Sequence, residues 1–347
     1  MKKYLFLLML VNICVAVNAQ NKWEKEPYLT KSFSGEAINQ VMAETNGGNI
    51  TVTGVDPSEP KVEVFVNQNN DRKNLLTDDE LKSKINEEYD LDVSVNNNKL
   101  TVTAKPKHRI TDWKRALNFS FKIYAPKNAS ADLKTSGGNI SLSNLSGDKD
   151  FTTSGGNLNL DGLEGKTKGS TSGGNINLSN SKDDIDVTTS GGNINAEKSS
   201  GNIKIITSGG SINMDNLDGK IKAETSGGNV RGEMIGGDLD ASTSGGNVSL
   251  HNLTCALKAG TSGGNVNVSM KTLGSYLSLY NSSGKISLEI PKGVGIDLKL
   301  SAKKISTPNI ANFSGTGSNE EMKGTVNGGG VPVTVDAGGG RIDLTFN

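Results

Sequence analysis

The sequence contains very few of the side chains that perform most protein chemistry. Among 347 residues there are two cysteines and two histidines, His108 and His251. So little histidine nearly excludes a histidine-rich metal site and histidine-based acid–base catalysis. A Ser-His-Asp triad on His251 stays open, because triads are defined by geometry and serine and aspartate occur throughout the chain. Cys14 lies in an N-terminal segment that we expect to be removed. Cys255 alone permits neither an intrachain disulfide nor a cysteine-ligated metal site.

The chain also lacks an excess of charge and has few aromatic residues. Lysine plus arginine and aspartate plus glutamate both number 37, and aromatic residues make up 5%. Such a near-neutral balance argues against nucleic acid or an anionic membrane as the partner. In the repeats described below the only aromatic residue is Phe151. Because sugar sites usually contain aromatic platforms, this scarcity weakens the case for a glycan site there.

The N-terminus predicts export. Lys2 and Lys3 precede an apolar run from Tyr4 to Val17, and Val-Asn-Ala stands before Gln20. This pattern is typical of a secretory signal peptide, residues 1–19, cleaved after Ala19. The apolar run is too short to span a membrane, and Cys14 lies inside it, so no lipobox is present. We expect an exported protein, in the periplasm or at the cell surface, with no transmembrane segment in the mature chain.

Glycine is abundant, and it recurs at a fixed period. The phrase Thr-Ser-Gly-Gly-Asn or a near copy returns with a constant 18-residue period and without an insertion. A constant period of this length indicates that each repeat is one structural unit stacked on the previous one. The eight copies begin at Thr135, Thr153, Thr171, Thr189, Thr207, Thr225, Thr243 and Thr261.

Positions one period apart share their chemistry, which predicts strands. Five residues after each threonine an Ile, Leu or Val stands in every copy, and the position two residues further on is almost wholly apolar. Apolar spacing by two is strand spacing. Ser-Gly-Gly-Asn forms one corner and a later glycine, as in Gly201, a second; we expect both to supply positive φ. The repeated threonine should point inward. The prediction is an all-β, single-stranded parallel β-solenoid (β-helix), right-handed, with 18-residue coils.

The flanking regions are less regular. Residues 20–134 are predicted to form an N-terminal β region and cap, with Thr77 and Glu80 as a capping box for a short helical insertion near 77–88. Leu91 to Ala104 is expected to be a hairpin. Residues 135–270 form the regular solenoid. Residues 271–347 are expected to form irregular C-terminal coils and a cap, because exposed strand edges must be covered, and residues 305–327 a long loop.

Two outward columns are candidate sites. In the first, carboxylates should stack about 5 Å apart on consecutive coils; there they could recruit a cation such as Ca²⁺, serve as a glycosidase pair, or simply be solvated turn residues. This column contains Glu197, Asp215 and Glu233. No other cofactor is predicted. The second column is a polar strip that could bind a glycan, and it contains Asn177, Asn195 and Asn213. A further column, which includes Asn157 and Asn175, is expected to form a ladder of amide–amide bonds.

The signal peptide, the Thr-Ser-Gly-Gly-Asn-Ile phrase and two worn copies at 283–286 and 337–342 carry a family resemblance. The chain resembles the bacterial β-strand-repeat "putative adhesins", a group similar to the GIN-domain "putative auto-transporter adhesin heads" common in Bacteroidota. This resemblance implies an all-β helical fold and an envelope or surface location. Those families have no assigned catalytic residues, so the resemblance transfers none to this chain.

Three functional hypotheses follow. The first is an exported, non-catalytic solenoid, an adhesin or envelope structural protein that presents an extended polar face to a protein or polysaccharide. A second is a carbohydrate-active β-helix enzyme, whose groove would have to come from residues 67–90, 105–118 or 305–327, because the core loops are minimal. The third is an envelope scaffold or sensor that works through a partner protein.

Overall fold

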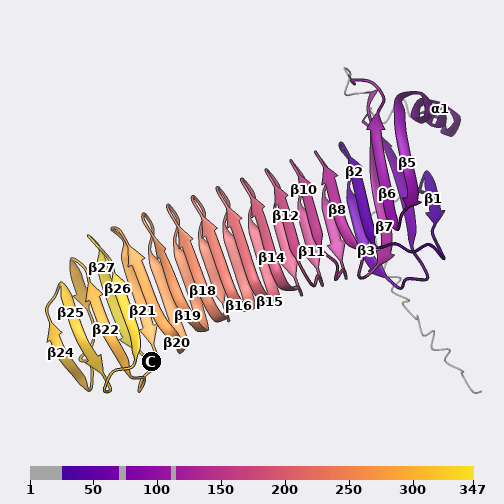
Figure 1. Ribbon diagram of the computed structural model, residues 1–347. Coiled ribbons are helices and arrows are strands. Elements are labelled where there is room, and N and C mark those ends of the chain that lie inside the picture. The colour runs from indigo at the N-terminus through magenta and orange to yellow at the C-terminus, as the bar shows by residue number, and fades with distance from the viewer. Residues whose placement is uncertain (1–25, 70–75, 111–114) are drawn as a thin grey trace, which may run out of the picture.

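The computed structural model describes residues 26–69, 76–110 and 115–347. The predicted signal peptide and Trp113 lie outside these ranges. The described residues form a long rod of stacked strands, wider at its N-terminal end, where the helix lies (Figure 1). They contain 27 strands and one helix. The all-β solenoid prediction is therefore confirmed.

The regular part of the rod consists of parallel strands that pair one repeat apart. Lys149 pairs with Thr167, and Ile176 pairs with Ile194. Strands on one side of the coil are β8 (Ser130–Thr135), β10 (Lys149–Thr153), β12 (Thr167–Thr171), β14 (Lys182–Thr189) and β18 (Gly236–Thr243). Those on the other side are β9 (Ile140–Ser143), β11 (Leu158–Asp161), β13 (Ile176–Ser179) and β17 (Val230–Glu233). Four long strands run through the second corner and contribute to both sides, namely β15 (Ile194–Thr207), β16 (Ile212–Thr225), β19 (Val248–Thr261) and β20 (Val266–Asn281).

The apolar columns fill the inside of the coil, and the repeated threonines point inward as predicted. Ile176 and Ile194 are fully buried, and Thr171 is 5% exposed. The Thr171 hydroxyl donates to the carbonyl oxygen of Gly156 on the previous coil at 2.8 Å and accepts from the amide of Gly174 at 3.2 Å. Each threonine of this kind therefore joins two coils at a place where a buried hydroxyl needs partners.

The two corners require glycine for different reasons. At the Ser-Gly-Gly corner the expectation of positive φ is wrong, because these glycines lie outside the left-handed region. A Cβ on Gly192 would instead lie 1.9 Å from the carbonyl oxygen of Gly174, so the close approach of the coils excludes a side chain. At the second corner the expectation is confirmed for Gly201, with φ 110°, and Gly219, with φ 118°, but not for Gly147, which lies outside the left-handed region. Asp183 occupies the same place with φ 76°.

A further set of equivalent positions shares a backbone conformation that was not predicted from the sequence. Seven positions that follow one another at the period of the repeat adopt left-handed backbone conformations, with φ between 48° and 63°. They lie just after the short strands on one side of the coil, or at the equivalent place inside the long strands β15, β16 and β19. Asparagine and glycine tolerate this conformation better than other residues do. The column contains Asn144, Gly162, Asn180, Lys198, Asn216, Met234 and Asn252. Met234 is also 50% exposed.

The asparagines of the Ser-Gly-Gly-Asn corners bond to the backbone rather than mainly to one another. The backbone N–H of Asn157 donates to Oδ1 of Asn139 at 2.7 Å, and the backbone N–H of Asn175 donates to Oδ1 of Asn157 at 2.7 Å. The expected amide–amide ladder in this column is therefore wrong as a general rule; the Nδ2 of Asn247, which donates to Asn229 Oδ1 at 3.3 Å, is the exception among the described residues. The Oδ1 of these asparagines thus accepts from a backbone N–H of the next coil, a common use of asparagine side chains at turns.

In two adjacent coils a polar side chain occupies an inward position that is apolar in the neighbouring coils. Lys149 is only 2% exposed, and its Nζ donates to the carbonyl oxygens of Gly147, at 2.6 Å, and Glu164. Burial lowers the pKa of Lys149 to about 8, against the opposing effect of three nearby carboxylates. On the next coil Thr167 pairs beside it, and its buried Oγ1 has no hydrogen-bond partner in the described structure.

At the N-terminal end the coil order differs from the chain order. The elements are β1 (Leu29–Ser32), β2 (Gln40–Thr45), β3 (Ile50–Val55), β4 (Lys61–Gln68), α1 (Asp78–Glu88), β5 (Tyr89–Asn96), β6 (Lys99–Pro106) and β7 (Leu117–Pro126). Strand β2 pairs with both β6 and β8, and β3 with both β7 and β9. The first coil therefore lies between the regular stack and a coil formed later in the chain. Strands β5 and β4 add antiparallel partners, including the predicted hairpin β5–β6, and α1 begins with the predicted capping box.

The C-terminal end uses the same arrangement. Its strands are β21 (Lys285–Ile290), β22 (Ile296–Ser301), β23 (Lys304–Ser306), β24 (Phe313–Gly317), β25 (Glu321–Val326), β26 (Val331–Asp336) and β27 (Arg341–Phe346). The last two strands lie between the coil of β20 and β21 and the coil of β22 and β23. The expected loop over 305–327 is wrong: β24 and β25 form an antiparallel hairpin that extends the sheet beyond β22. Phe313 and Met322 of this hairpin pack on the core, which stabilises it.

Candidate functional site

The structure brings the two predicted site columns together in one shallow groove. A hollow of about 380 Å³ is lined by Asn177, Asn195 and Asn213 and by Glu197 and Asp215. The amides bond along the rod: Nδ2 of Asn195 donates to Oδ1 of Asn177 at 3.1 Å, and Nδ2 of Asn213 donates to Oδ1 of Asn195 at 2.9 Å. Their donors and acceptors are therefore partly satisfied within the protein. The use of this strip as a binding surface stays a prediction.

The carboxylate column is aligned as predicted but does not by itself assemble a metal site. Glu197 pairs with Asp215, and Asp215 pairs with Glu233, on consecutive coils. Glu233 accepts a hydrogen bond from Nδ2 of Asn252 at 3.2 Å. Within residues 26–69, 76–110 and 115–347, no three His, Cys, Asp or Glu side chains are grouped so that they could hold a metal ion. The Ca²⁺ site therefore stays a hypothesis that would require the side chains to rearrange.

A second groove, which sequence reasoning missed, runs along the outer surface of β12, β14, β15, β16 and β18. We call it the charged groove. Its volume is about 400 Å³. Because equivalent outward positions on consecutive strands are one repeat apart, its polar lining forms two rows along the rod. One row is Lys166, Asp184, Asn202, Lys220 and Asp238, and the other is Lys168, Asp186, Lys204, Lys222 and Asp240.

All four aspartates of the charged groove have partners within the protein. Asp186 forms an ion pair with Lys204 at 2.9 Å, and Asp240 one with Lys258 at 3.6 Å. Asp184 accepts from Nδ2 of Asn202 at 3.3 Å. The fourth, Asp238, accepts a hydrogen bond from the hydroxyl of Tyr276.

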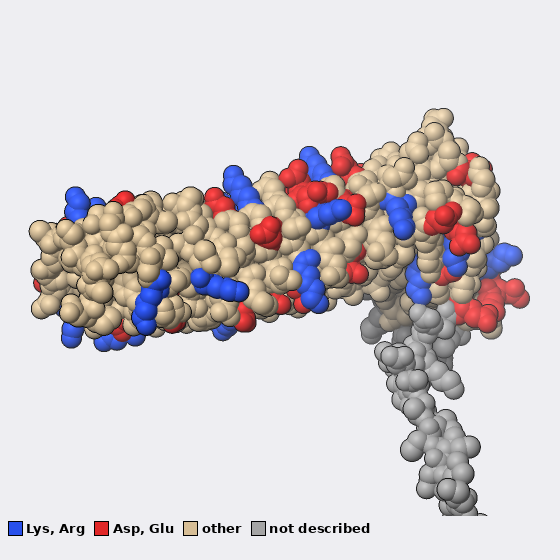
Figure 2. Space-filling view, turned by 90° about the horizontal axis from the view of Figure 1, so that it is seen from below, with Lys and Arg blue, Asp and Glu red and all other residues tan. Residues whose placement is uncertain are grey.

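The lysines of the charged groove are less fully paired. Lys222 forms an ion pair with Glu224 at 3.0 Å. The side chains of Lys166, Lys168 and Lys220 are exposed and have no hydrogen-bond or ion-pair partner among the residues that the structure describes. The groups that the groove leaves available are therefore ammonium groups. Both rows of the groove mix acidic and basic side chains. Figure 2 shows both signs interspersed along the middle of the rod on the face that it draws.

Tyr276 of β20 forms one end of the charged groove. Strands β19 and β20 pair at an 18-residue offset up to Cys255 and Leu273, apart from a local shift at Leu253 and Met270, and at a 20-residue offset from Leu257 and Leu277 onward. Two extra residues thus enter β20, and Tyr276 extends over the sheet. Its hydroxyl donates to Oδ1 of Asp238 at 2.8 Å, which raises the pKa of Tyr276 to about 12. The break of the period near residue 270 was the only sequence signal for this insertion.

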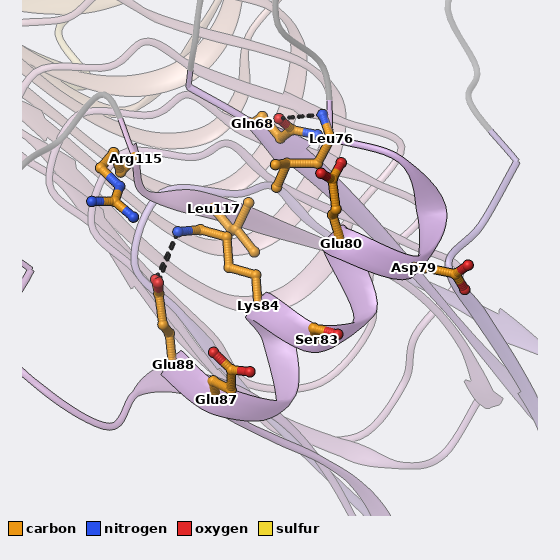
Figure 3. Close-up of a pocket in the computed structure, with 10 residues that line it drawn as sticks. All are labelled: Gln68, Leu76, Asp79, Glu80, Ser83, Lys84, Glu87, Glu88, Arg115 and Leu117. Carbon is orange, nitrogen blue, oxygen red and sulfur yellow. Dashed lines mark hydrogen bonds and ion pairs between the residues drawn. The ribbon is translucent and has the colours of Figure 1, made fainter.

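A third hollow, of about 500 Å³, lies beside α1 (Figure 3). It falls in a region that the enzyme hypothesis would need. Two of the four carboxylates that line it are engaged: Glu88 forms an ion pair with Lys84 at 2.9 Å, and Glu80 accepts hydrogen bonds from the backbone and hydroxyl of Thr77. These bonds lower the pKa of Glu80. A general acid requires a raised carboxyl pKa, so Glu80 is unsuited to that role.

Fold and surface together define a parallel β-solenoid rod with polar grooves on its outer faces. The chain belongs to the family described as Toastrack DUF4097, whose model matches residues 58–242 and 237–345. The adhesin-type resemblance is thereby supported at the level of this family, and the narrower similarity to GIN-domain heads stays a prediction. No curated protein gives a match. Of the described helices, none has the length and apolar character that crossing a bilayer demands.

Two solved structures are similar to the chain along most of its length. One is a "putative cell adhesion protein" from Clostridium sporogenes, 12% identical, with a TM-score of 0.20 over 92% of this chain and 98% of the other. The second is a "putative adhesin" from Bacteroides fragilis, 13% identical, with a TM-score of 0.25 over 91% of this chain and 96% of the other. At these TM-scores neither likeness contributes to the function proposed below.

Proposed function

We propose that this protein is an exported, non-catalytic, adhesin-like binding rod of the bacterial cell envelope. It presents its long outer faces to a polysaccharide or a protein. The observation that carries the proposal is the uninterrupted stack of equal coils, in which short corners leave the outward columns open to solvent along several coils. Extended surfaces of this kind are what solenoid proteins offer to partners.

The described part of the chain favours binding over catalysis. The regular coils have no long loops that would enclose a substrate, and in the hollow beside α1 Glu80 and Glu88 are held in capping and ion-pair contacts. Export follows from the predicted signal peptide, and its cleavage would leave Gln20 as the first residue. Mass spectrometry of protein collected from the envelope fraction checks that step, because a retained Met1 contradicts it.

The experiment that tests the function is a binding screen of the exported chain on arrays of bacterial and host polysaccharides, with and without calcium. Saturable binding without release of shortened glycans is the expected result. Release of products would replace the proposal with the enzyme hypothesis. Failure to bind any polysaccharide or any envelope protein would also contradict it.

The calcium arm tests the carboxylate column separately. If Glu197 and Asp215 hold a cation that ligand binding requires, binding weakens without calcium. The double variant Glu197→Ala/Asp215→Ala should then bind as weakly with calcium as the unmodified protein does without it. Binding that is independent of calcium leaves these residues as solvated turn residues.

A further inference from the structure

We infer that the charged groove is the binding site for an acidic polysaccharide that lies along the rod axis. The inference rests on the proposed binding function and names both the surface and the class of ligand. The groove follows five consecutive coils, which span roughly 19 Å at the usual strand spacing. This length accommodates a short run of sugar units of an extended chain, with Tyr276 at one end.

The ligand's negative charge follows from which groups are left unpaired. The aspartates of the groove are bonded to Lys204, Lys258, Asn202 and Tyr276. The side chains of Lys166, Lys168 and Lys220, in contrast, are exposed and unpartnered in the part of the chain that the structure describes. Ammonium groups at separate points along a groove form charge-assisted hydrogen bonds with carboxylates or sulfates spaced along a polymer. An acidic polysaccharide carries such groups at intervals.

The sugar part of the ligand follows from the rest of the lining. Carboxylates and an amide alternate with the lysines, and these groups accept and donate hydrogen bonds to hydroxyls. Tyr276 is half-buried, and its hydroxyl is fixed by Asp238, so the ring orientation is set before a ligand arrives. A pre-oriented aromatic ring beside a few convergent polar groups is what a small carbohydrate site requires.

The same lining disfavours nucleic acid, the other common polyanion. A nucleic-acid backbone carries closely spaced phosphates and is bound by an accumulation of positive charge. Here Asp184 and Asp186 interrupt the lysines on one coil, and Asp238 and Asp240 interrupt them on another. Phosphates passing along the groove would meet these carboxylates on more than one coil, whereas a polymer with separated acidic groups places hydroxyls there.

The test measures binding of the full exported chain to polygalacturonate, alginate and hyaluronan by calorimetry, with neutral dextran and single-stranded DNA as comparisons. We expect saturable binding to at least one acidic polysaccharide, weakened by salt, and none to dextran. The triple variant Lys166→Ala/Lys168→Ala/Lys220→Ala should lose about tenfold in affinity, because each exposed ionic contact is worth about two- to threefold and three are lost together. These lysines are exposed, so the variant should fold normally.

A charge-matched control distinguishes the groove from the overall charge of the protein. The variant Lys271→Ala/Lys299→Ala/Lys303→Ala also removes three exposed lysines, all outside the groove, and should bind like the unmodified protein. Tyr276→Ala should weaken binding, and Tyr276→Phe should weaken it less, because the ring remains while the bond to Asp238 is lost.

The outcomes separate this inference from the proposed function. Equal losses in the two triple variants, or stronger binding to dextran or DNA, overturn the acidic-polysaccharide site while leaving a binding rod in place. Binding to an acidic polysaccharide that all groove variants retain also overturns the site. A chain that binds no polysaccharide and no envelope protein overturns the site and the proposed function together.

Discussion

Two adjacent glycines of one corner should respond in opposite ways to the same substitution. In the Ser-Gly-Gly corner of the fourth repeat, a Cβ added to Gly192 would lie 1.9 Å from the carbonyl oxygen of Gly174. A Cβ on Gly191 has its nearest neighbour at 3.6 Å, an ordinary contact. Neither glycine has a left-handed φ. The substitutions Gly192→Ala and Gly191→Ala therefore differ almost only in what the new methyl group meets.

The structure sets the expected magnitudes. Gly192→Ala must move two coils apart by more than an ångström, and overpacking of this kind costs about 1–3 kcal/mol. The displaced carbonyl of Gly174 also accepts a hydrogen bond from the buried Thr189 hydroxyl at 2.8 Å. Loss of that bond costs about 1–3 kcal/mol more. The free energy of unfolding should thus fall by roughly 2–6 kcal/mol, a large part of a typical total. Gly191→Ala should instead raise it by about 0.4–1 kcal/mol, because alanine restricts the unfolded chain.

Urea unfolding followed by circular dichroism measures both changes under the same conditions. The expected result is a much lower midpoint for Gly192→Ala and an equal or higher midpoint for Gly191→Ala. Equal midpoints for the two variants would refute the claim that close coil approach, rather than backbone conformation, requires glycine here. A larger loss for Gly191→Ala would refute the assignment of which glycine faces the coil below.

Three further perturbations address polar and conformational strain. Met234→Asn should raise the free energy of unfolding by about 0.5–1 kcal/mol, since asparagine tolerates the φ of 54° better; an unchanged urea midpoint would contradict this. Thr167→Val should raise it by about 1 kcal/mol by removing an unpartnered buried hydroxyl, whereas Thr171→Val should lower it because that hydroxyl is bonded. The folded-state pKa of Lys149 is about 8, below its ordinary 10.5, so between these pH values the unfolded chain binds more protons than the folded chain. The free energy of unfolding should therefore rise with pH across that window. Lys149→Met should remove this rise when melting is measured as a function of pH.

The regular stack could be predicted from the sequence because each coil repeats the environment of the previous one. Ile176, Ile194 and Ile212 are equivalent in sequence, pair in register and are all fully buried. The alternation of side chains also indicated that the repeated threonine points inward. The reason for the corner glycines was not accessible in this way, because a repeat pattern shows that glycine is needed but not whether backbone conformation or close packing needs it.

The ends of the rod could not be derived from periodicity. Thr45 pairs in register with Thr135, so the early copy of the repeat phrase belongs to the stack, as its sequence indicates. The sequence does not show that residues 99–106 lie on the other side of that coil, because chain order and coil order separate there. Chain order and coil order differ at the C-terminal end as well, where β26 pairs with the earlier strand β22. Strand pairing between segments distant in the chain depends on which edges remain open, and a period measured along the chain does not record it.

The difference between inward and outward positions indicates which residues determine the binding specificity of the rod. An inward residue touches the coil above and the coil below, so its column must repeat, and Phe151 is accommodated only because Gly169 on the next coil leaves space for its ring. An outward residue has no such constraint. The row that starts at Lys166 changes its chemistry from coil to coil, and Tyr276 enters where the period is broken. Residues that repeat in every coil therefore stabilise the rod. Outward residues that differ from the repeat can distinguish one ligand from another. For this reason the charged groove is a stronger candidate for recognition than the repeated asparagine strip, whose amides bond to one another along the rod.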